Sequence, residues 1–398
     1  MPPDAPQNLP AAPPAPNNGG ARKGRLRALA CPESSPAPPL LGAGGDSSDL
    51  SVAVVSYNTR ALLRACLASL TARQAEGEAT LEIIVADNGS TDGSLDMVRA
   101  EFPCVRVIET GGNIGFGRAN NLALRDARGR CFCLLNSDAE ALPGALRKTL
   151  AFLDAHPDVG LAGGQLLWPD GRPQTSWGHD PTLAGVWEEQ TFLGAVRARL
   201  AWNRSPEPNP PAPFPVKEGG VRVVSSPFPN REGSALAPGV GPNAPGVGPN
   251  APGHSPRDVH QISGAYMVLR REAWRQVGGF DPAYFMYNED VDLNVRLRRA
   301  GWRVVFLPDV FIRHHLGASS RADWQTRARM VSAYNESRFL YFTRFHGPKA
   351  GRRLRAYCLL GAAIRLTGWS LPALVKPGAR DKVKLFREVW RRTRAMTT

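Results

Sequence analysis

The 398-residue sequence predicts an α/β fold with a doubly wound, mostly parallel sheet. Two patterns predict this class. Short apolar runs alternate with stretches of helical spacing, and small polar residues or glycines follow most of the apolar runs. Such alternation is typical of parallel strands that are joined by crossover helices. The hydrophobic content of 42% is enough for a sizeable core.

The first 162 residues supply these elements in turn. Strands are expected at 50–56, 81–86, 105–108, 130–135 and 159–162. Helices are expected between them at 60–72, 94–102, 117–127 and 143–156, the last with Pro143 in its first turn. Ligands of such sheets bind beyond the carboxyl ends of the strands, so we expect functional residues there.

Two segments are too rich in Pro, Gly and Ala to bury a core. Residues 1–48 are expected to be a disordered tail. Residues 203–258 contain a seven-residue Pro/Gly repeat and are expected to be a disordered insertion. Ordered structure is expected to resume at residue 259.

The cysteines and the apolar runs indicate a cytoplasmic protein. All six cysteines are scattered and expected to be reduced: Cys31, Cys66, Cys104, Cys131, Cys133 and Cys358. The amino-terminal segment lacks the apolar core of a secretory signal. The sequence has no run of about 18 apolar residues, so no transmembrane helix is expected.

Most of the net charge of +14 lies in the tail. From Arg344 onward, fourteen Lys or Arg stand against two acids, a net charge of +12. Residues 346–398 are expected to form basic amphipathic helices, chiefly at 357–366 and 382–394, and this pattern suits peripheral contact with an anionic membrane. The alternative is a helix pair that packs on the body with solvated arginines. No DNA-binding motif accompanies the charge, so nucleic acid is not expected as a partner.

Three acids stand at the expected start of a helix. Glu289, Asp290 and Asp292 precede Leu293 and Leu297, which are at helical spacing. The helix dipole favours carboxylates there, and a junction of loop and helix suits a general base, for which Asp290 is our candidate. The alternative is ordinary charge at a helix N-terminus.

Asp138 ends the fourth apolar strand, in Asn136-Ser-Asp138. A carboxylate in that place can hold Mg²⁺ or Mn²⁺, which usually bridge substrate phosphates. The alternative is a solvated turn. His314 follows an apolar, edge-like segment at 304–313 and is a candidate to complete the metal shell. Its neighbour His315 should point to the opposite face, so at most one of the two is a ligand.

Polar turns also follow the first three strands. Ser56 and Asn58 end the first strand, and Asp87 begins a small polar run whose side chains could bind a base or ribose. Gly115 lies in the third loop, between Asn113 and Asn120, where glycine lets a phosphate approach the backbone. The alternative is a set of ordinary turns and helix caps.

Taken in order, seven motifs resemble those of the family 2 glycosyltransferases, most closely the rhamnosyltransferase-like subgroup. They are Val55-Ser-Tyr-Asn58, Asp87-Asn-Gly-Ser-Thr-Asp92, Asn113 to Phe116, Leu135-Asn-Ser-Asp138, Ser263-Gly-Ala265, Glu289-Asp-Val-Asp-Leu293 and His314. The resemblance covers about residues 50–345 outside the insertion. It implies a GT-A fold, an inverting reaction, a nucleotide-sugar donor and a divalent metal, Mg²⁺ or Mn²⁺.

The resemblance also implies a role for each matching residue. Residues 49–202 would bind the nucleotide sugar, and 259–345 would carry the acceptor side and the base. Asp290 would be the base, and Asp138 and His314 would face the metal. Donor-binding residues would be Ser56, Asn58, Asp87, Asn113, Gly115, Asn120 and Asn136; acceptor-side residues would be Gly264, Ala265, Glu289 and Asp292. The family often has a second acid where Asn136 stands, so the metal would depend mainly on Asp138.

The sequence thus predicts transfer of a hexose to a hydroxyl of a glycan or lipid-linked glycan, in cell-surface polysaccharide synthesis. Rhamnose is the leading sugar because of the subgroup. One alternative is a degenerate carbohydrate- or membrane-binding protein, but this should have lost Asp138 or Asp290. The other is a nucleotidyltransferase, which needs a glycine-rich loop where the chain reads Ser56 to Arg60 without a glycine.

Overall fold

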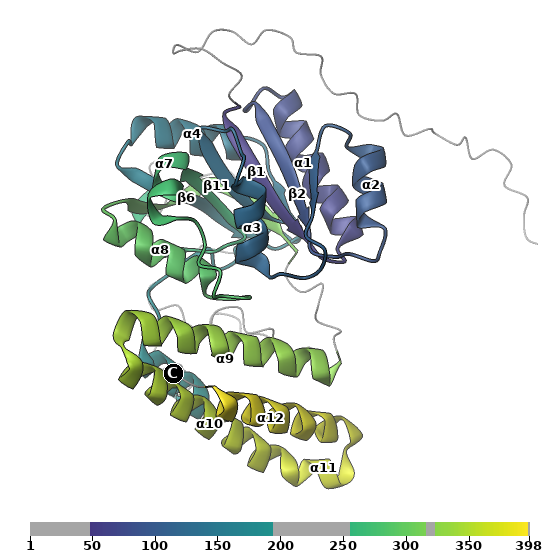
Figure 1. Ribbon diagram of the computed structural model, residues 1–398, viewed down its shortest axis with the longest axis vertical. Coiled ribbons are helices and arrows are strands. Elements are labelled where there is room, and N and C mark those ends of the chain that lie inside the picture. Colours follow the sequence, from purple (N-terminus) through teal and green to yellow (C-terminus); the bar gives the residue numbers. More distant parts are fainter. Residues whose placement is uncertain (1–47, 194–254, 316–322, 397–398) are drawn as a thin grey trace, which may run out of the picture.

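The computed structural model describes residues 48–193, 255–315 and 323–396 (Figure 1). The expected tail, apart from Ser48, and most of the expected insertion lie outside these ranges. Residues 257 and 258 form a short strand, so ordered structure begins slightly earlier than the sequence indicated.

A nine-stranded mixed sheet forms the centre of the described chain. Its order is β3-β2-β1-β4-β10-β6-β11-β5, and β8 also pairs with β11. The strands are β1 (Leu50–Ser56), β2 (Leu81–Asp87), β3 (Arg106–Glu109), β4 (Cys131–Asn136), β5 (Ala139–Ala141), β6 (Val159–Leu167), β8 (Arg257–Asp258), β10 (Tyr266–Arg270) and β11 (Arg303–His314). The β3-β2-β1-β4 ladder and the β6-β11 pair are parallel, whereas β10 is antiparallel to both its neighbours. The predicted mostly parallel sheet is confirmed.

Helices cover both faces of this sheet, because successive strand residues point to opposite faces. On one face, Val52 and Val54 join the core that contains α1 (Arg60–Ala75), α2 (Ser94–Glu101) and α4 (Ala145–Ala155). On the other face, Ala53 joins the core that contains α3 (Phe116–Leu124), α7 (Arg271–Val277) and α8 (Glu289–Arg299). The sheet is therefore doubly wound, as predicted.

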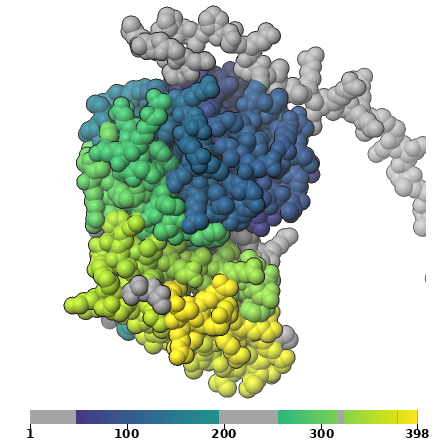
Figure 2. Space-filling model, viewed as in Figure 1, coloured from purple at the N-terminus to yellow at the C-terminus, as the bar shows by residue number. Residues whose placement is uncertain are grey.

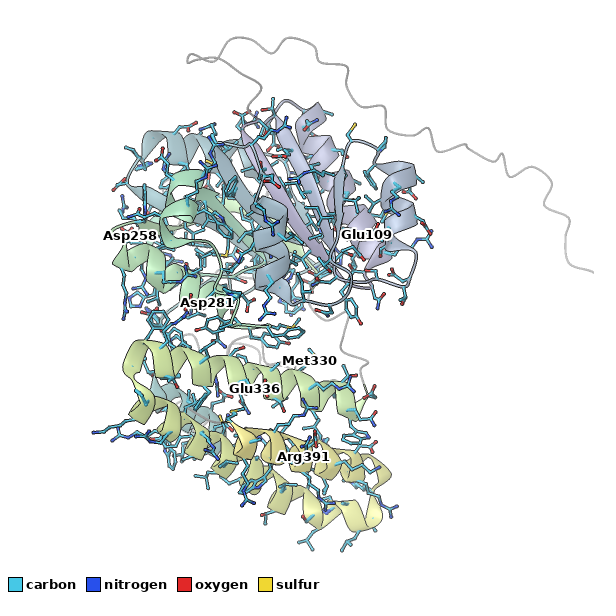
Figure 3. All side chains as sticks on the ribbon, in the orientation of Figure 1. Glu109, Asp258, Asp281, Met330, Glu336 and Arg391 are labelled. Atoms are coloured by element: carbon cyan, nitrogen blue, oxygen red, sulfur yellow. The ribbon has the colours of Figure 1, made fainter. Side chains whose placement is uncertain are left out.

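The carboxyl-terminal helices and α5 form a third layer, which we call the helical layer. It contains α5 (Leu183–Thr191), α9 (Trp324–His346), α10 (Pro348–Ser370), α11 (Pro372–Val375) and α12 (Pro377–Ala395). In Figure 3, Met330 and Glu336 mark α9, which lies between the sheet and α12 with Arg391. Val291 and Val295 of α8 share a core with Phe339 and Phe342 of α9, so the layer packs directly on the body (Figure 2). The predicted carboxyl-terminal helices are confirmed, but α9 was not predicted.

Three local expectations were wrong. Helix α4 begins at Ala145, after Gly144 in the left-handed conformation, so Pro143 precedes the helix. The segment at 304–313 is no edge, because β11 has β6 on one side and β5 and β8 on the other. Cys104 is disulfide-bonded and lies in an exposed turn, where another thiol can reach it.

The other described cysteines agree with the expectation. Cys66, Cys131, Cys133 and Cys358 are free and buried. Cys31 lies outside the described residues. No helix within the described ranges is long and apolar enough to cross a membrane.

Candidate active site

A cavity of about 400 Å³ lies between the sheet's body and the helical layer. The body contributes Asn136 at the end of β4, His314 at the end of β11, Gly264 and Ala265 before β10, and Glu289 and Asp290 at the start of α8. The helical layer contributes Glu189, Tyr334 and Arg338. Residues of four sequence motifs that lie up to 178 positions apart therefore share one cavity.

Asp290 is positioned by the turn that begins α8. Tyr287 and Asn288 both have positive φ, at 70° and 59°, and this tight turn brings the first residues of the helix to the cavity. The Asp290 carboxylate accepts the backbone N–H of Gly264 at 3.0 Å and that of Val291 at 2.9 Å. Burial raises the pKa of Asp290 above its ordinary value, although these hydrogen bonds oppose the shift. A carboxylate of raised basicity that lines a cavity is suited to take a proton.

Glu289 lies beside Asp290 and is only 6% exposed. Burial, together with the charge of Asp290, raises the pKa of Glu289 to about 8. Its Oε2 is one of the buried side-chain atoms without a hydrogen-bond partner among the described residues. The two carboxyl groups therefore titrate as a coupled pair, and burial favours a proton on Glu289.

Asp138 and His314 approach each other beside the cavity, which His314 lines and Asp138 does not. His314 Nε2 lies 3.3 Å from Asp138 Oδ1, and His314 is 5% exposed. The other ring nitrogen, Nδ1, lies 3.0 Å from Gln174 Oε1. Gln174 donates its Nε2 hydrogen to the carbonyl oxygen of His314 at 2.6 Å, so its Oε1 must accept from the ring.

This hydrogen-bond chain fixes the tautomer of His314. Because Nδ1 donates to Gln174, the Nε2 of a neutral ring presents a lone pair toward the Asp138 carboxylate. A cation between these two acceptors would satisfy both, and the Asn136 side-chain amide also lies 3.5 Å from Nε2. The described residues hold no group of three or more His, Cys, Asp or Glu that could bind a metal. A carboxylate and an imidazole would suit Mg²⁺ or Mn²⁺ that takes its remaining ligands from phosphates and water.

His315 points elsewhere. Its Nε2 lies 2.7 Å from Glu140 Oε1, and the side chain is partly exposed. Of the two adjacent histidines, only His314 lines the cavity.

The expected donor loops lie side by side at the carboxyl ends of β1, β2 and β3. Asn58 accepts the Thr91 N–H at 2.7 Å, and Asp87 accepts the N–H groups of Gly89 and Ser90 through Oδ2. The Oδ1 of Asp87 is buried and has no partner among the described residues, so it is free to accept from a ligand.

Ser56 links these loops to the loop that contains Ser137 and Asp138. Its hydroxyl oxygen lies 3.2 Å from that of Thr59, which lies 3.1 Å from that of Ser137. The donor loops therefore adjoin the cavity, although its lining includes neither Ser56 nor Asp87.

Gly115 joins the third donor loop to the Asp290 loop. Its φ is +91°, and a Cβ at this residue would lie 2.2 Å from the carbonyl oxygen of Phe285. That same oxygen accepts the N–H of Phe116 at 3.1 Å. Asn113 closes the loop by accepting the Gly115 N–H at 3.1 Å.

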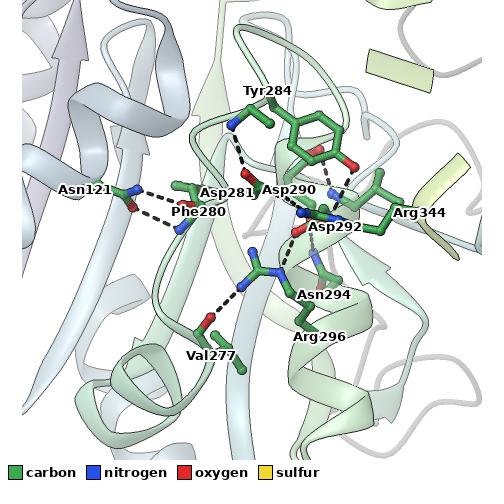
Figure 4. A network of polar contacts seen from close by, with 12 residues as sticks. Asn121, Val277, Phe280, Asp281, Tyr284, Asp290, Asp292, Asn294, Arg296 and Arg344 are labelled. Carbon is green, nitrogen blue, oxygen red and sulfur yellow. Dashed lines mark hydrogen bonds and ion pairs between the residues drawn. The ribbon is translucent and has the colours of Figure 1, made fainter. Parts of the chain in front are cut away.

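Two expected site residues face the protein interior instead. Asn120 is 1% exposed and donates to the carbonyl of Phe116 in its own helix. Asp292 is fully buried, does not line the cavity, and contacts Arg296 and Arg344, as Figure 4 shows. Asp292 stands two residues after Asp290, about 200° around the helix, so the two side chains leave opposite sides.

The helical layer supplies cavity residues that the sequence did not indicate. The Arg338 guanidinium is 2% exposed and forms a 2.6 Å ion pair with Glu189, which joins α9 to α5. Tyr334 lies under Arg338, with its ring centroid 4.6 Å from the guanidinium carbon. Buried residues of α9 at helical spacing, such as Ala328, Ser332 and Asn335, could have revealed the helix, but nothing in the sequence pairs it with α5.

Two family matches cover more than half of the chain. Residues 51–206 match the family described as Glycosyl transferase family 2, and residues 253–333 match Glycosyltransferase like family 2.

Curated relatives show similar sequences. The chain is 29% identical to N-acetylglucosaminyl-diphospho-decaprenol L-rhamnosyltransferase of Mycobacterium tuberculosis, over 84% of this chain and 97% of the relative. It is 33% identical to rhamnosyltransferase WbbL of Escherichia coli over 23% of this chain and 33% of the relative. It is 26% identical to O-antigen biosynthesis protein RfbC of Myxococcus xanthus over 61% of this chain and 15% of the relative.

Among solved structures, a mannosyltransferase from Pyrobaculum calidifontis, in complex with GDP-Man and Mn²⁺, has a TM-score of 0.43 and 18% identity, over 88% of this chain and 86% of that chain. The structure of S. aureus TarS 1-349 has a TM-score of 0.40 and 14% identity, over 87% of this chain and 91% of that chain.

Proposed function

The chain belongs to glycosyl transferase family 2, and on that basis we propose that it transfers rhamnose, with inversion, from a nucleoside-diphosphate sugar to a hydroxyl of a lipid-linked glycan. Membership of this family, with its GT-A fold, makes the chain a glycosyltransferase. The sugar and the acceptor are inferred from the names of the relatives, foremost the mycobacterial L-rhamnosyltransferase, which the chain matches over 97% of that protein's length.

The observation that carries the proposal is the position of Asp290 in the cavity. Its carboxylate is held by the Gly264 N–H, and His314 of the Asp138–His314 pair lines the same cavity. This arrangement supports Asp290 as the base and the Asp138–His314 pair as the metal-binding side of one site.

In the proposed reaction, Asp290 accepts the proton of the acceptor hydroxyl as that oxygen bonds to the anomeric carbon of the donor. The bond from the anomeric carbon to the diphosphate breaks at the same time, and the leaving group departs with the electron pair. Glu289, on which burial favours a proton, leaves Asp290 as the charged member of the pair. The protonated Glu289 also has a hydrogen to donate to a sugar oxygen.

Asp138 and His314 would hold Mg²⁺ or Mn²⁺, which neutralises charge on the diphosphate leaving group when bound. The lone pair that His314 directs toward Asp138 supports this assignment. Asp87, with its unpartnered Oδ1, is our candidate to bind the nucleoside.

A lipid-linked acceptor implies that the chain works at a membrane surface. We expect peripheral contact with the cytoplasmic face through the basic carboxyl-terminal helices, since the acceptor must reach the cavity between them and the sheet.

The test is a donor panel with a defined acceptor. Purified chain would be incubated with nucleotide sugars, Mn²⁺ and an N-acetylglucosaminyl-diphospho-polyprenol of short chain length, and the product would be measured by mass. Addition of one deoxyhexose from a rhamnose donor is expected. Transfer of another sugar would overturn the choice of rhamnose, and the absence of transfer from every donor would overturn the proposed reaction.

A further inference from the structure

Exposed large apolar side chains gather on one part of the helical layer. Of the eleven such side chains in the described residues, eight lie on α5 and the two residues that follow it, or on α10, α11 and the residue between them. They are Trp187, Phe192, Leu193, Leu360, Ile364, Leu371, Leu374 and Val375, which we call the α5–α11 surface. The last three residues are 75%, 74% and 82% exposed, far more than ordinary scattered surface residues require.

The exposed side chains of α5 and α10 lie on neighbouring helices. Leu360, Ile364 and Leu371 are separated by intervals close to whole helical turns, so they leave the same side of α10. Helix α5 lies against α10, because the Trp187 ring packs edge-on against Tyr357 with centroids 4.9 Å apart. Phe192 lies 4.5 Å from the guanidinium carbon of Arg365 on the same helix.

Basic residues surround the most exposed end of this surface. Lys376, Arg380, Lys382 and Lys384 are all exposed and follow α11 directly. The single acid among them, Asp381, pairs with Lys384 at 3.5 Å. Lys382 Nζ lies 3.6 Å from the ring centroid of Trp369, and tryptophan beside lysine is typical of a membrane–water boundary.

We propose that the α5–α11 surface docks the chain on a membrane that contains anionic lipids. The apolar side chains would enter the boundary between headgroups and acyl chains, and the surrounding lysines and arginines would contact lipid phosphates. The net charge of +12 from residue 344 onward supports an anionic partner. A second copy of the chain is a poorer partner, because it would bring two such basic segments together.

This inference deepens the proposed function by naming the surface on which a lipid-linked acceptor would be met. Figure 1 shows α11 at the end of the helical layer that is distant from the sheet. The α5–α11 surface includes Trp187 of α5, the helix that also contributes Glu189 to the cavity. The inference rests on the proposed function only through the lipid-linked acceptor, and binding to vesicles can be measured without any substrate.

The experiment compares the full chain with two variants in sedimentation with vesicles. Vesicles of phosphatidylglycerol and phosphatidylcholine would be compared with vesicles of phosphatidylcholine alone. The test variant combines Leu371→Ser, Leu374→Ser and Val375→Ser. The control is Val331→Ser, an exposed apolar residue of α9 outside the surface.

We expect the parent chain to bind the anionic vesicles and to lose affinity as salt rises. The triple variant should bind at least about tenfold more weakly, because three apolar side chains no longer enter the membrane. The control should bind like the parent. Circular dichroism and transfer to a water-soluble acceptor analogue should be unchanged in both variants.

Two results would overturn the inference: equal vesicle binding by the triple variant and the parent, or a parent dimer in solution that the triple variant converts to monomer. If the parent transfers no sugar but still binds vesicles more tightly than the triple variant does, the proposed function is overturned and the inference about the α5–α11 surface stands.

Discussion

The backbone N–H of Gly264 donates to Asp290 Oδ2 across 3.0 Å, and a Cβ at residue 264 would lie only 3.3 Å from that oxygen. The contact joins the segment before β10 to the first turn of α8, two regions 26 residues apart. It holds the carboxylate in one orientation and leaves room for nothing larger than glycine without a shift of the Asp290 side chain.

Asp290→Asn should lower kcat by about 10²–10⁴-fold, since the amide cannot accept the acceptor's proton. Donor affinity should stay within about twofold, because the amide keeps the shape and hydrogen-bonding oxygen of the carboxylate. Initial rates at saturating donor and acceptor, with donor binding by calorimetry, measure the two effects. Asp96→Asn, an exposed acid of α2, is the control and should retain full activity. A near-parental kcat in Asp290→Asn would remove this residue from the role of base.

Gln174→Leu should weaken Mn²⁺ binding by about 10–100-fold, the usual cost of losing the partner that orients a metal-ligating histidine. Leucine removes the acceptor that keeps the Nδ1 hydrogen in place, so the lone pair on Nε2 is no longer fixed toward Asp138. His314→Ala should weaken binding at least as much. Calorimetric titration with Mn²⁺ in the presence of nucleoside diphosphate gives the affinities.

His315→Ala is the matched control for this pair, because His315 contacts Glu140 and does not line the cavity. Its Mn²⁺ affinity should equal that of the parent. Loss of affinity in His315→Ala with none in His314→Ala would reverse the assignment.

The parallel strands explain how much of this site the sequence could predict. Asp87 and Asn136 each follow an apolar run, and in a parallel ladder such ends meet at one edge of the sheet. The acidic start of α8 was equally visible, because three carboxylates before a leucine pair at helical spacing are typical of a helix N-terminus.

The direction of side chains within helices was harder to predict from the sequence. Asn120 and Asp292 were expected site residues, yet each is buried against its own or a neighbouring helix. Helical geometry alone could have separated Asp292 from Asp290. Contacts between distant segments, such as Arg338 with Glu189 across 149 positions, had no local pattern that could predict them.

Gly115→Ala should destabilise the fold by more than about 2 kcal/mol. Two effects add: alanine is strained at a positive φ, and its Cβ would lie 2.2 Å from the carbonyl oxygen of Phe285. Gly111→Ala is the matched control, since Gly111 has φ of +76° and nothing within 4 Å of its Cβ position. The control should therefore show only the backbone strain of about 1–2 kcal/mol. Urea unfolding of the two variants separates the backbone strain from the collision. Equal losses of stability in both variants would mean that the loop moves freely away from Phe285.

Glu289 should make the stability of the parent chain fall as pH rises from about 4.5 to about 8. Its pKa is about 8 in the folded chain, against an ordinary value of 4.5, because the side chain is buried beside Asp290. Between these values the folded state binds one more proton than the unfolded state, so the free energy of unfolding falls by at most about 1.4 kcal/mol per pH unit. The contribution is fully present below pH 4.5 and is lost as pH passes 8.

Glu289→Gln should remove this dependence, because glutamine resembles the protonated acid at every pH. Urea denaturation at pH 5, 6, 7 and 8 would follow the difference between variant and parent, which cancels the titration of all other groups that the substitution leaves unchanged. The variant should gain stability relative to the parent at each step upward. A constant difference across this range would show that Glu289 is already ionised at pH 5, and the negative charge of the cavity would then be shared by Glu289 and Asp290 at neutral pH.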